Sequence, residues 1–91
     1  LARLFYEKKN YSAAIPHLKM FLAAMGSNDE YWFMLGKSYF ETKSFSSAYK
    51  CFNTINDKTR DVLFYLARSA AICKKDKESV NLYQKLLKLD P

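Results

Sequence analysis

Glycine and proline are scarce in this 91-residue chain, which holds only two of each. All-β domains need many turns, so this scarcity, together with the rarity of alternating polar and apolar residues, argues against an all-β fold. No apolar run approaches the roughly 18 residues that a membrane-spanning helix needs. No signal peptide is visible, and the chain starts without Met, so we expect it to be cut from a longer protein whose targeting it does not reveal.

Residues that commonly carry chemistry are also scarce. Cys51 and Cys73 are far apart and fit no metal or redox spacing, so we expect reduced, partly buried packing residues in a reducing compartment. The single histidine, His17, lies within a predicted helix, and we expect it to be structural or at the surface. With no glycine-rich phosphate loop and no Ser/His/Asp or Cys/His set, we predict no catalytic residue, no metal site, no cofactor and no enzyme activity.

Apolar and aromatic residues are plentiful, at 49% and 16% of the chain, so a packed core is expected. The most informative stretch is residues 32–52. It reads Trp32-x-x-Leu35-Gly36-x-x-Tyr39, then Ala48-x-x-x-Phe52. We expect one helix at 29–41, capped by Asn28 or Asp29, and a second at 45–56, capped by Ser44. Gly36 and Ala48 would allow close approach of the two helices, and Phe52 would fill the space beside them.

The same pattern recurs on both sides. Phe5 and Ala14, Tyr39 and Ala48, and Ala70 and Ser79 are each separated by nine residues. We therefore expect three units within one domain, 1–91: a truncated unit at 1–28, then 29–59 and 60–91. The remaining helices are predicted at 1–8, 11–25, 60–74 and 77–89, with Gly26 ending the second, Asp76 capping the last and Pro91 as a stop. The second unit is three residues shorter than the first, so its second helix or the loop after it should be short.

On these motif residues the chain resembles the tetratricopeptide repeat (TPR) family. The resemblance implies an all-α, right-handed solenoid of helical hairpins, with about two and a half repeats. It also implies an intracellular scaffold for protein–protein interaction and complex assembly, binding a helix or an extended peptide segment in its concave groove. The motif residues should form the core, whereas the first helix of each unit should face the partner.

The partner-binding residues follow from the register of that family. They are Arg3, Tyr6, Phe33, Met34, Lys37, Phe64, Tyr65, Arg68 and Ile72, with Glu7, Glu30, Glu41 and Asp61 on the same face. One subgroup of the family grips chaperone C-terminal tails with a clamp of two Lys, one Arg and two Asn. The four clamp positions that fall within this chain hold Arg3, Met34, Asp61 and Tyr65, so we do not expect that partner.

The competing interpretation is a basic edge. The net charge is +6, and lysines recur at the predicted turns within each unit, at Lys8, Lys9, Lys43, Lys74, Lys75 and Lys77. Stacked repeats bring equivalent turns to one edge, which could bind nucleic acid or an acidic partner. The first fourteen residues are also loosely similar to the helical N-terminal region of the Ran-binding nucleoporins. The expected compartment is therefore the cytoplasm or the nucleus, the nuclear pore included.

Overall fold

The computed structural model describes residues 2–26 and 28–89, and these residues form six α-helices and no strand. The helices are α1 (Ala2–Glu7), α2 (Tyr11–Met25), α3 (Asp29–Glu41), α4 (Phe45–Thr54), α5 (Arg60–Ile72) and α6 (Asp76–Leu89). The predicted bounds of α2 and α3 are confirmed. Leu1, the first residue of the helix predicted at 1–8, and Pro91, the predicted stop, lie outside the described residues.

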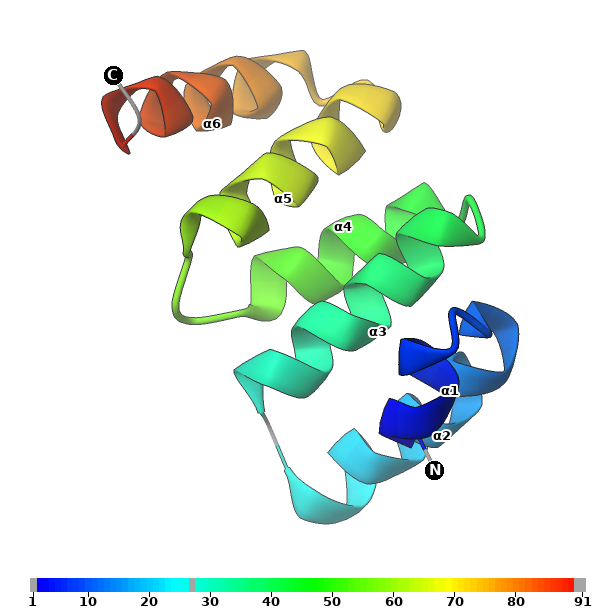
Figure 1. The fold of residues 1–91 in the computed structure, drawn as a ribbon. Helices are drawn as coiled ribbons and strands as arrows, with labels where there is room; N and C mark the ends of the chain where they lie inside the picture. Colours follow the sequence, from blue (N-terminus) through cyan, green and yellow to red (C-terminus); the bar gives the residue numbers. More distant parts are fainter. Residues whose placement is uncertain (1, 27, 90–91) are drawn as a thin grey trace.

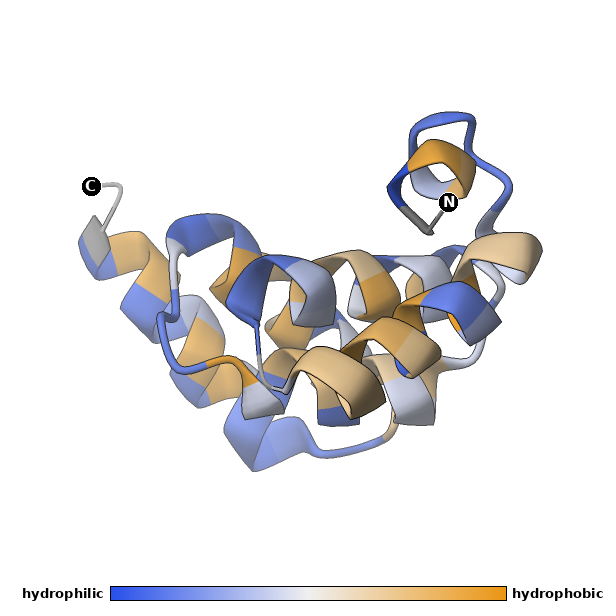
Figure 2. Ribbon diagram, turned by 90° about the horizontal axis from the view of Figure 1, so that it is seen from below, coloured by the Kyte–Doolittle hydropathy of each residue, from blue (hydrophilic) through white to orange (hydrophobic). Residues whose placement is uncertain are grey.

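The helices form a stack in which each one packs mainly against its neighbours in sequence. Figure 1 shows three antiparallel pairs, α1/α2, α3/α4 and α5/α6, with the two termini at opposite ends of the stack. In Figure 2 hydrophobic and hydrophilic stretches alternate along the helices, as expected when one face of each is buried. α3 also touches α5, so the first helices of successive pairs lie on one side. The TPR-like helical-hairpin solenoid is confirmed.

The contact between α3 and α4 depends on the absence of a side chain at Gly36. A Cβ atom built there would lie 2.8 Å from Cε1 of Phe52. Phe52 and Ala48 are fully buried, in a cluster with Ile55, Val62 and Leu66. The sequence interpretation of Gly36, Ala48 and Phe52 is therefore confirmed.

Trp32 lies between two hydrophobic clusters and packs against both, although its side chain is only half-buried. The first cluster, around Leu18, Met34 and Leu35, joins α2 to α3; the second, around Phe52, joins α3, α4 and α5. Because one ring contacts both clusters, Trp32 links the packing of successive helix pairs.

Several helix ends differ from the sequence expectation. α4 ends at Thr54, because Ile55 adopts an extended conformation and buries its side chain. α5 ends at Ile72, which places Cys73 in the following turn and not within a helix. Asp76 is the first residue of α6, whereas the Lys75 carbonyl accepts the first helical bond, from Ser79 N–H. α4 has ten residues and α2 has fifteen, so the shortening predicted for the second unit falls on the helix.

The predicted caps are partly confirmed. The Asn28 side chain accepts hydrogen bonds from the backbone N–H groups of Glu30 and Tyr31, at 3.0 and 3.3 Å. Ser44 precedes α4, but its side chain makes no capping hydrogen bond. Gly26 ends α2 with a φ of 87°, and its N–H donates to the Leu22 carbonyl.

Candidate functional site

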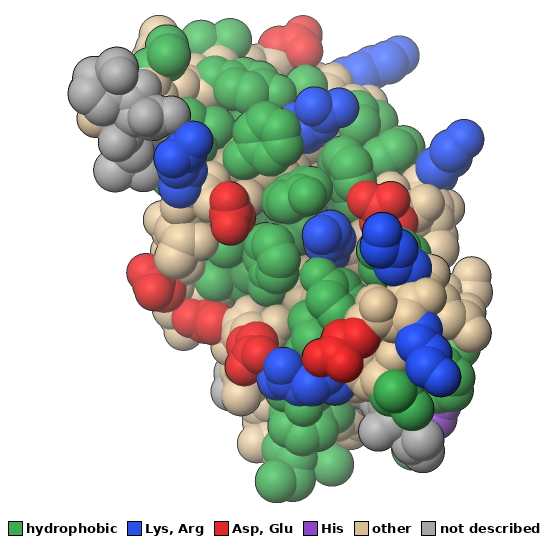
Figure 3. Space-filling view, in the orientation of Figure 1, with side chains coloured by type: hydrophobic (Ala, Val, Ile, Leu, Met, Phe, Trp, Pro, Cys, Tyr) green, Lys and Arg blue, Asp and Glu red, His purple; other side chains and the backbone are tan. Residues whose placement is uncertain are grey.

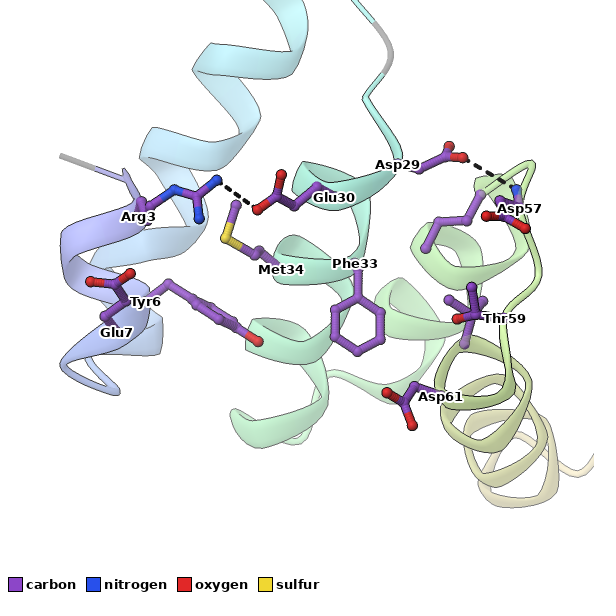
Figure 4. A pocket seen from close by; sticks show the side chains of 12 residues that line it. Arg3, Tyr6, Glu7, Asp29, Glu30, Phe33, Met34, Asp57, Thr59 and Asp61 are labelled. Carbon is purple, nitrogen blue, oxygen red and sulfur yellow. Dashed lines mark hydrogen bonds and ion pairs between the residues drawn. The ribbon is translucent and has the colours of Figure 1, made fainter. Parts of the chain in front are cut away.

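A hollow of about 410 Å³ opens between α1, α3 and the start of α5, and we call it the groove. Figure 4 shows its walls: Arg3 and Tyr6 extend from α1 on one side, Asp57, Thr59 and Asp61 lie on the other, and Phe33 lies between them. The complete lining is Arg3, Tyr6, Glu7, Asp29, Glu30, Phe33, Met34, Ile55, Asp57, Thr59, Asp61 and Val62. The floor is therefore apolar, and the rim is mostly acidic.

One ion pair and two backbone hydrogen bonds order part of the groove. The Arg3 guanidinium donates to Glu30 Oε1 at 2.6 Å, and this bond raises the pKa of Arg3. The Asp29 carboxylate accepts the backbone N–H groups of Asn56 and Asp57, at 3.3 and 3.2 Å. Asp29 thus ties the loop that follows α4 to the first turn of α3, and this holds Asp57 at the rim.

Aromatic rings form the middle of the concave side. The Phe33 ring lies 5.7 Å from the Phe52 ring and 5.9 Å from the Tyr65 ring, centroid to centroid. Tyr65 also packs against Phe40 and Phe64. These contacts are within the range of favourable aromatic pairs, so they hold Phe33 and Tyr65 in place while leaving one side of each accessible.

Two cations lie further along the helices. Lys37 Nζ is 5.8 Å from the centroid of the Tyr65 ring, and Arg68 Cζ is 5.5 Å from that of the Phe64 ring. Burial lowers the pKa of Lys37, but the neighbouring phenol oxygens of Tyr6 and Tyr65 outweigh burial, so the pKa is raised overall. Burial raises the pKa of the Tyr6 phenol. Lys37 therefore stays charged near neutral pH.

The structure separates the predicted partner-binding residues into groups. Arg3, Tyr6, Phe33 and Met34 meet in the groove, together with Glu7, Glu30 and Asp61. Phe64 lines an adjoining hollow with Asp61 and with Tyr83, Leu86 and Leu87 of α6. Ile72 is exposed near the end of α5, and Glu41 is exposed at the end of α3.

Met34 requires a correction, because we expected it to lie on the exposed inner surface. Its side chain is only 4% exposed and belongs to the cluster that joins α2 to α3. The reason is that α2 packs against α3 in this cluster, and Tyr6 of α1 packs against the same cluster. A charged substitution at Met34 would therefore unfold the stack instead of probing the groove.

Other lining residues were not expected from the repeat register. Asp29 was predicted only as a cap, and Asp57 and Thr59 only as part of a loop. A signal for them exists in the sequence, because the loop after each second helix returns the chain to the edge where the next first helix begins. Acidic residues in these loops and in the first turns of α3 and α5 therefore gather at one edge.

The turns within the helix pairs share an unusual backbone conformation. Lys9, Lys43 and Lys74 occupy equivalent turns, and their φ angles are 61°, 67° and 63°. Each of the three N–H groups donates to a carbonyl three residues earlier. Left-handed φ values favour glycine, so a lysine in each turn carries a conformational cost.

The described residues offer little to a metal ion or to nucleophilic chemistry. Among them, no group of three or more His, Cys, Asp or Glu is arranged to hold a metal. The rings of His17 and Phe5 are stacked, 5.2 Å apart, so the histidine has a packing role. Cys51 is buried and free, and burial raises the pKa of its thiol to about 11. None of the described helices is long and apolar enough to cross a bilayer.

Comparison with known families agrees with this architecture. A family model described as "Anaphase-promoting complex, cyclosome, subunit 3" matches residues 7–86, and that family is built from TPR-like repeats. Repeats of this kind are typically non-catalytic scaffolds for protein–protein interaction. Among curated proteins, none gave a significant match.

Proposed function

This chain belongs to the family of anaphase-promoting complex, cyclosome, subunit 3, and we propose that it binds a protein partner in the groove. The ligand is a helix or an extended peptide segment, and the partner is another component of a multi-subunit assembly. The compartment is the cytoplasm or the nucleus, the three repeat units form one domain over 1–91, and the chain is not an enzyme.

One observation carries this proposal: large apolar side chains remain accessible on the concave side while their neighbours are packed. Phe64 and Ile72 are 41% and 46% exposed. The half-buried Tyr65 ring packs against Phe64, and the half-buried Phe33 ring packs against Tyr65. An apolar surface bordered by charged residues suits an amphipathic segment, whose apolar face would cover these rings. The contributing residues are Arg3, Tyr6, Phe33, Lys37, Phe64, Tyr65, Arg68 and Ile72, with Met34 supporting them from beneath.

The test compares two surface substitutions of similar chemistry. Phe64→Asp changes the concave side, whereas Met20→Asp changes an apolar position on α2 that is 68% exposed. The 91-residue chain and both variants are used to capture partners from a cell extract, and captured proteins are identified by mass spectrometry. We expect Phe64→Asp to lose the partners that Met20→Asp retains, with the two circular dichroism spectra alike. Phe64 lines the hollow that adjoins the groove, so a partner retained by Phe64→Asp would contradict a ligand that extends from the groove over that hollow.

A second candidate is the basic edge formed by the turn lysines. The observation in its favour is that all three left-handed turn positions hold lysine despite the cost of that conformation. Acidic residues such as Glu41 and Glu78 lie close in sequence to these turn lysines. Another lysine of the same turns, Lys75, has its Nζ atom 5.2 Å from the centroid of the Tyr49 ring.

Binding to single-stranded RNA or to an acidic peptide, measured at several salt concentrations, tests this candidate. The basic edge would be supported if the affinity falls steeply as salt rises. This salt dependence should disappear in the triple variant Lys9→Gly/Lys43→Gly/Lys74→Gly. Binding that is unchanged in the triple variant would exclude it.

A further inference from the structure

The charged residues that line the groove are mostly acidic, whereas the chain as a whole is basic. Glu7, Asp29, Glu30, Asp57 and Asp61 line it, which is five of the nine acidic residues of a protein with net charge +6. Of the fifteen basic residues only Arg3 lines it, and its guanidinium is bonded to Glu30. The rim of the groove is therefore acidic on both sides.

The opposite charge appears two helical turns further along. α3 carries Glu30, then Phe33, then Lys37, and α5 repeats this order with Asp61, Phe64 and Arg68. In both helices the acid and the base are seven residues apart, which is about 10 Å along the helix axis. Figure 3 shows the result on the surface: a hydrophobic band has acidic side chains gathered at its lower left and Lys and Arg mostly at its right.

The chain itself contains an example of a base meeting the acidic end. Arg3 of α1 lies against the first turn of α3, where it pairs with Glu30. Asp61 holds the equivalent position in α5, and among the described residues it has no hydrogen-bond or ion-pair partner. A base supplied by a bound segment would form an ion pair with Asp61, as Arg3 does with Glu30.

The two cations at the other end are held on the concave side. Lys37 lies near both Tyr6 of α1 and Tyr65 of α5, so its ammonium group lies between α1 and α5. Arg68 lies over the Phe64 ring, and 41% of the Phe64 side chain is exposed. Both cations can meet a negative group that approaches over the apolar band.

We infer that the groove selects an amphipathic α-helix of dipolar charge, in which a base and an acid seven residues apart flank apolar side chains. This inference rests on the proposed function and adds the chemistry of the ligand. The base would meet Asp57 and Asp61, the apolar side chains would cover Phe33 and Phe64, and the acid would meet Lys37 and Arg68. A helix matches because its own positions i and i+7 lie on one face, with the same spacing as in α3 and α5.

The test uses three designed helical peptides of about 18 residues, long enough to hold helical structure. They share one apolar face and differ only at the two flanking positions, which are Glu and Lys, Glu and Glu, or Lys and Lys. Binding to the 91-residue chain is measured by fluorescence anisotropy. We expect the Glu/Lys peptide to bind about fivefold more tightly than either control, and this preference to fall in about 0.5 M salt.

Charge variants of the protein supply the reciprocal measurement. In Arg68→Glu, the affinity of the Lys/Lys peptide relative to that of the Glu/Lys peptide should rise about fivefold. The reason is that a base of the peptide now meets a carboxylate at this position. In Asp57→Lys/Asp61→Lys the preference for Glu/Lys over Glu/Glu should disappear. All three residues are exposed, and circular dichroism checks that the variants stay folded.

The outcomes separate this inference from the proposed function. If the three peptides bind equally and Phe64→Asp abolishes all binding, the groove and its adjoining hollow bind helices but the charge preference is wrong. If no peptide binds, or if binding survives Phe64→Asp, the proposed function fails and the inference fails with it.

Discussion

Two buried serines at equivalent positions differ in their hydrogen bonding. Ser38 in α3 and Ser69 in α5 are both fully buried and 31 residues apart. The Ser38 hydroxyl donates to the Met34 carbonyl at 2.8 Å, whereas the Ser69 hydroxyl has no hydrogen-bond partner among the described residues. A buried polar group without a partner costs stability, so one serine supports the fold and the other opposes it.

We therefore expect Ser69→Ala to raise the free energy of unfolding by about 1 kcal/mol and Ser38→Ala to lower it by about 1 kcal/mol. Urea denaturation followed by circular dichroism measures both, and each variant serves as the control for the other. Equal destabilisation by the two substitutions would show that the Ser69 hydroxyl is bonded in solution.

The two cysteines should differ in reactivity. Cys51 is 5% exposed and the pKa of its thiol is raised to about 11, whereas Cys73 is half-buried in the turn after α5. The thiolate is the reactive form, so at pH 8 iodoacetamide should modify Cys73 at least about tenfold faster than Cys51. Peptide mapping by mass spectrometry measures the two rates, and in denaturant they should become equal. A fast reaction of Cys51 in the folded chain would contradict its burial.

At the scale of the helices, α3 and α4 approach each other closely at Gly36. Gly36 meets the Phe52 ring, and the equivalent position in α5 holds Ala67, which is also fully buried. The third pair tolerates this methyl group because its counterpart of Phe52 is Tyr83, which is 39% exposed and not enclosed. The two helix pairs therefore differ in how tightly their faces are covered.

Gly36→Ala should lower the free energy of unfolding by about 1–3 kcal/mol, because the new Cβ atom would clash with Phe52. Adding Phe52→Leu should recover part of this loss by removing the clashing ring atoms, and thermal melting measures both variants. Ala67→Gly is the matched control, expected to cost about 1 kcal/mol from helix propensity. If Gly36→Ala is neutral, α3 and α4 are less closely packed than the structure shows.

For the whole molecule, the two ends of the stack have different surfaces. Leu18 and Phe52 occupy one repeat position and are fully buried by the next helix pair, whereas Tyr83 at that position of α6 is 39% exposed. Val80 and Leu87 on the same helix are 54% and 69% exposed. The face of α6 beyond α5 is therefore apolar and uncovered, which favours self-association.

We expect the chain to associate as its concentration rises and Tyr83→Asp/Leu87→Asp to shift it toward the monomer. Analytical ultracentrifugation measures this shift. The control is Met20→Asp, at a position on α2 that is 68% exposed and lies outside this face. Equal effects of the two variants would indicate nonspecific association.

The sequence by itself determined the helices and the pairing of α3 with α4. Helix formation depends on contacts within a few residues, so caps such as Asn28 and the recurrent nine-residue interval were sufficient. The close contact of Gly36 with Phe52 was predictable for the same reason, since a motif residue without a side chain has a definite partner across a short turn.

Only the tertiary structure decided which residues of the concave side are covered. Met34 is buried because it belongs to the cluster where α2 packs against α3, and Asp57 reaches the groove because Asp29 holds the loop after α4. Both results depend on how helices far apart in sequence cross one another, and periodicity within a single helix does not specify that crossing. The uneven distribution of charge in a basic chain follows from the same cause, because stacking brings acids from three separate segments to the rim of one groove.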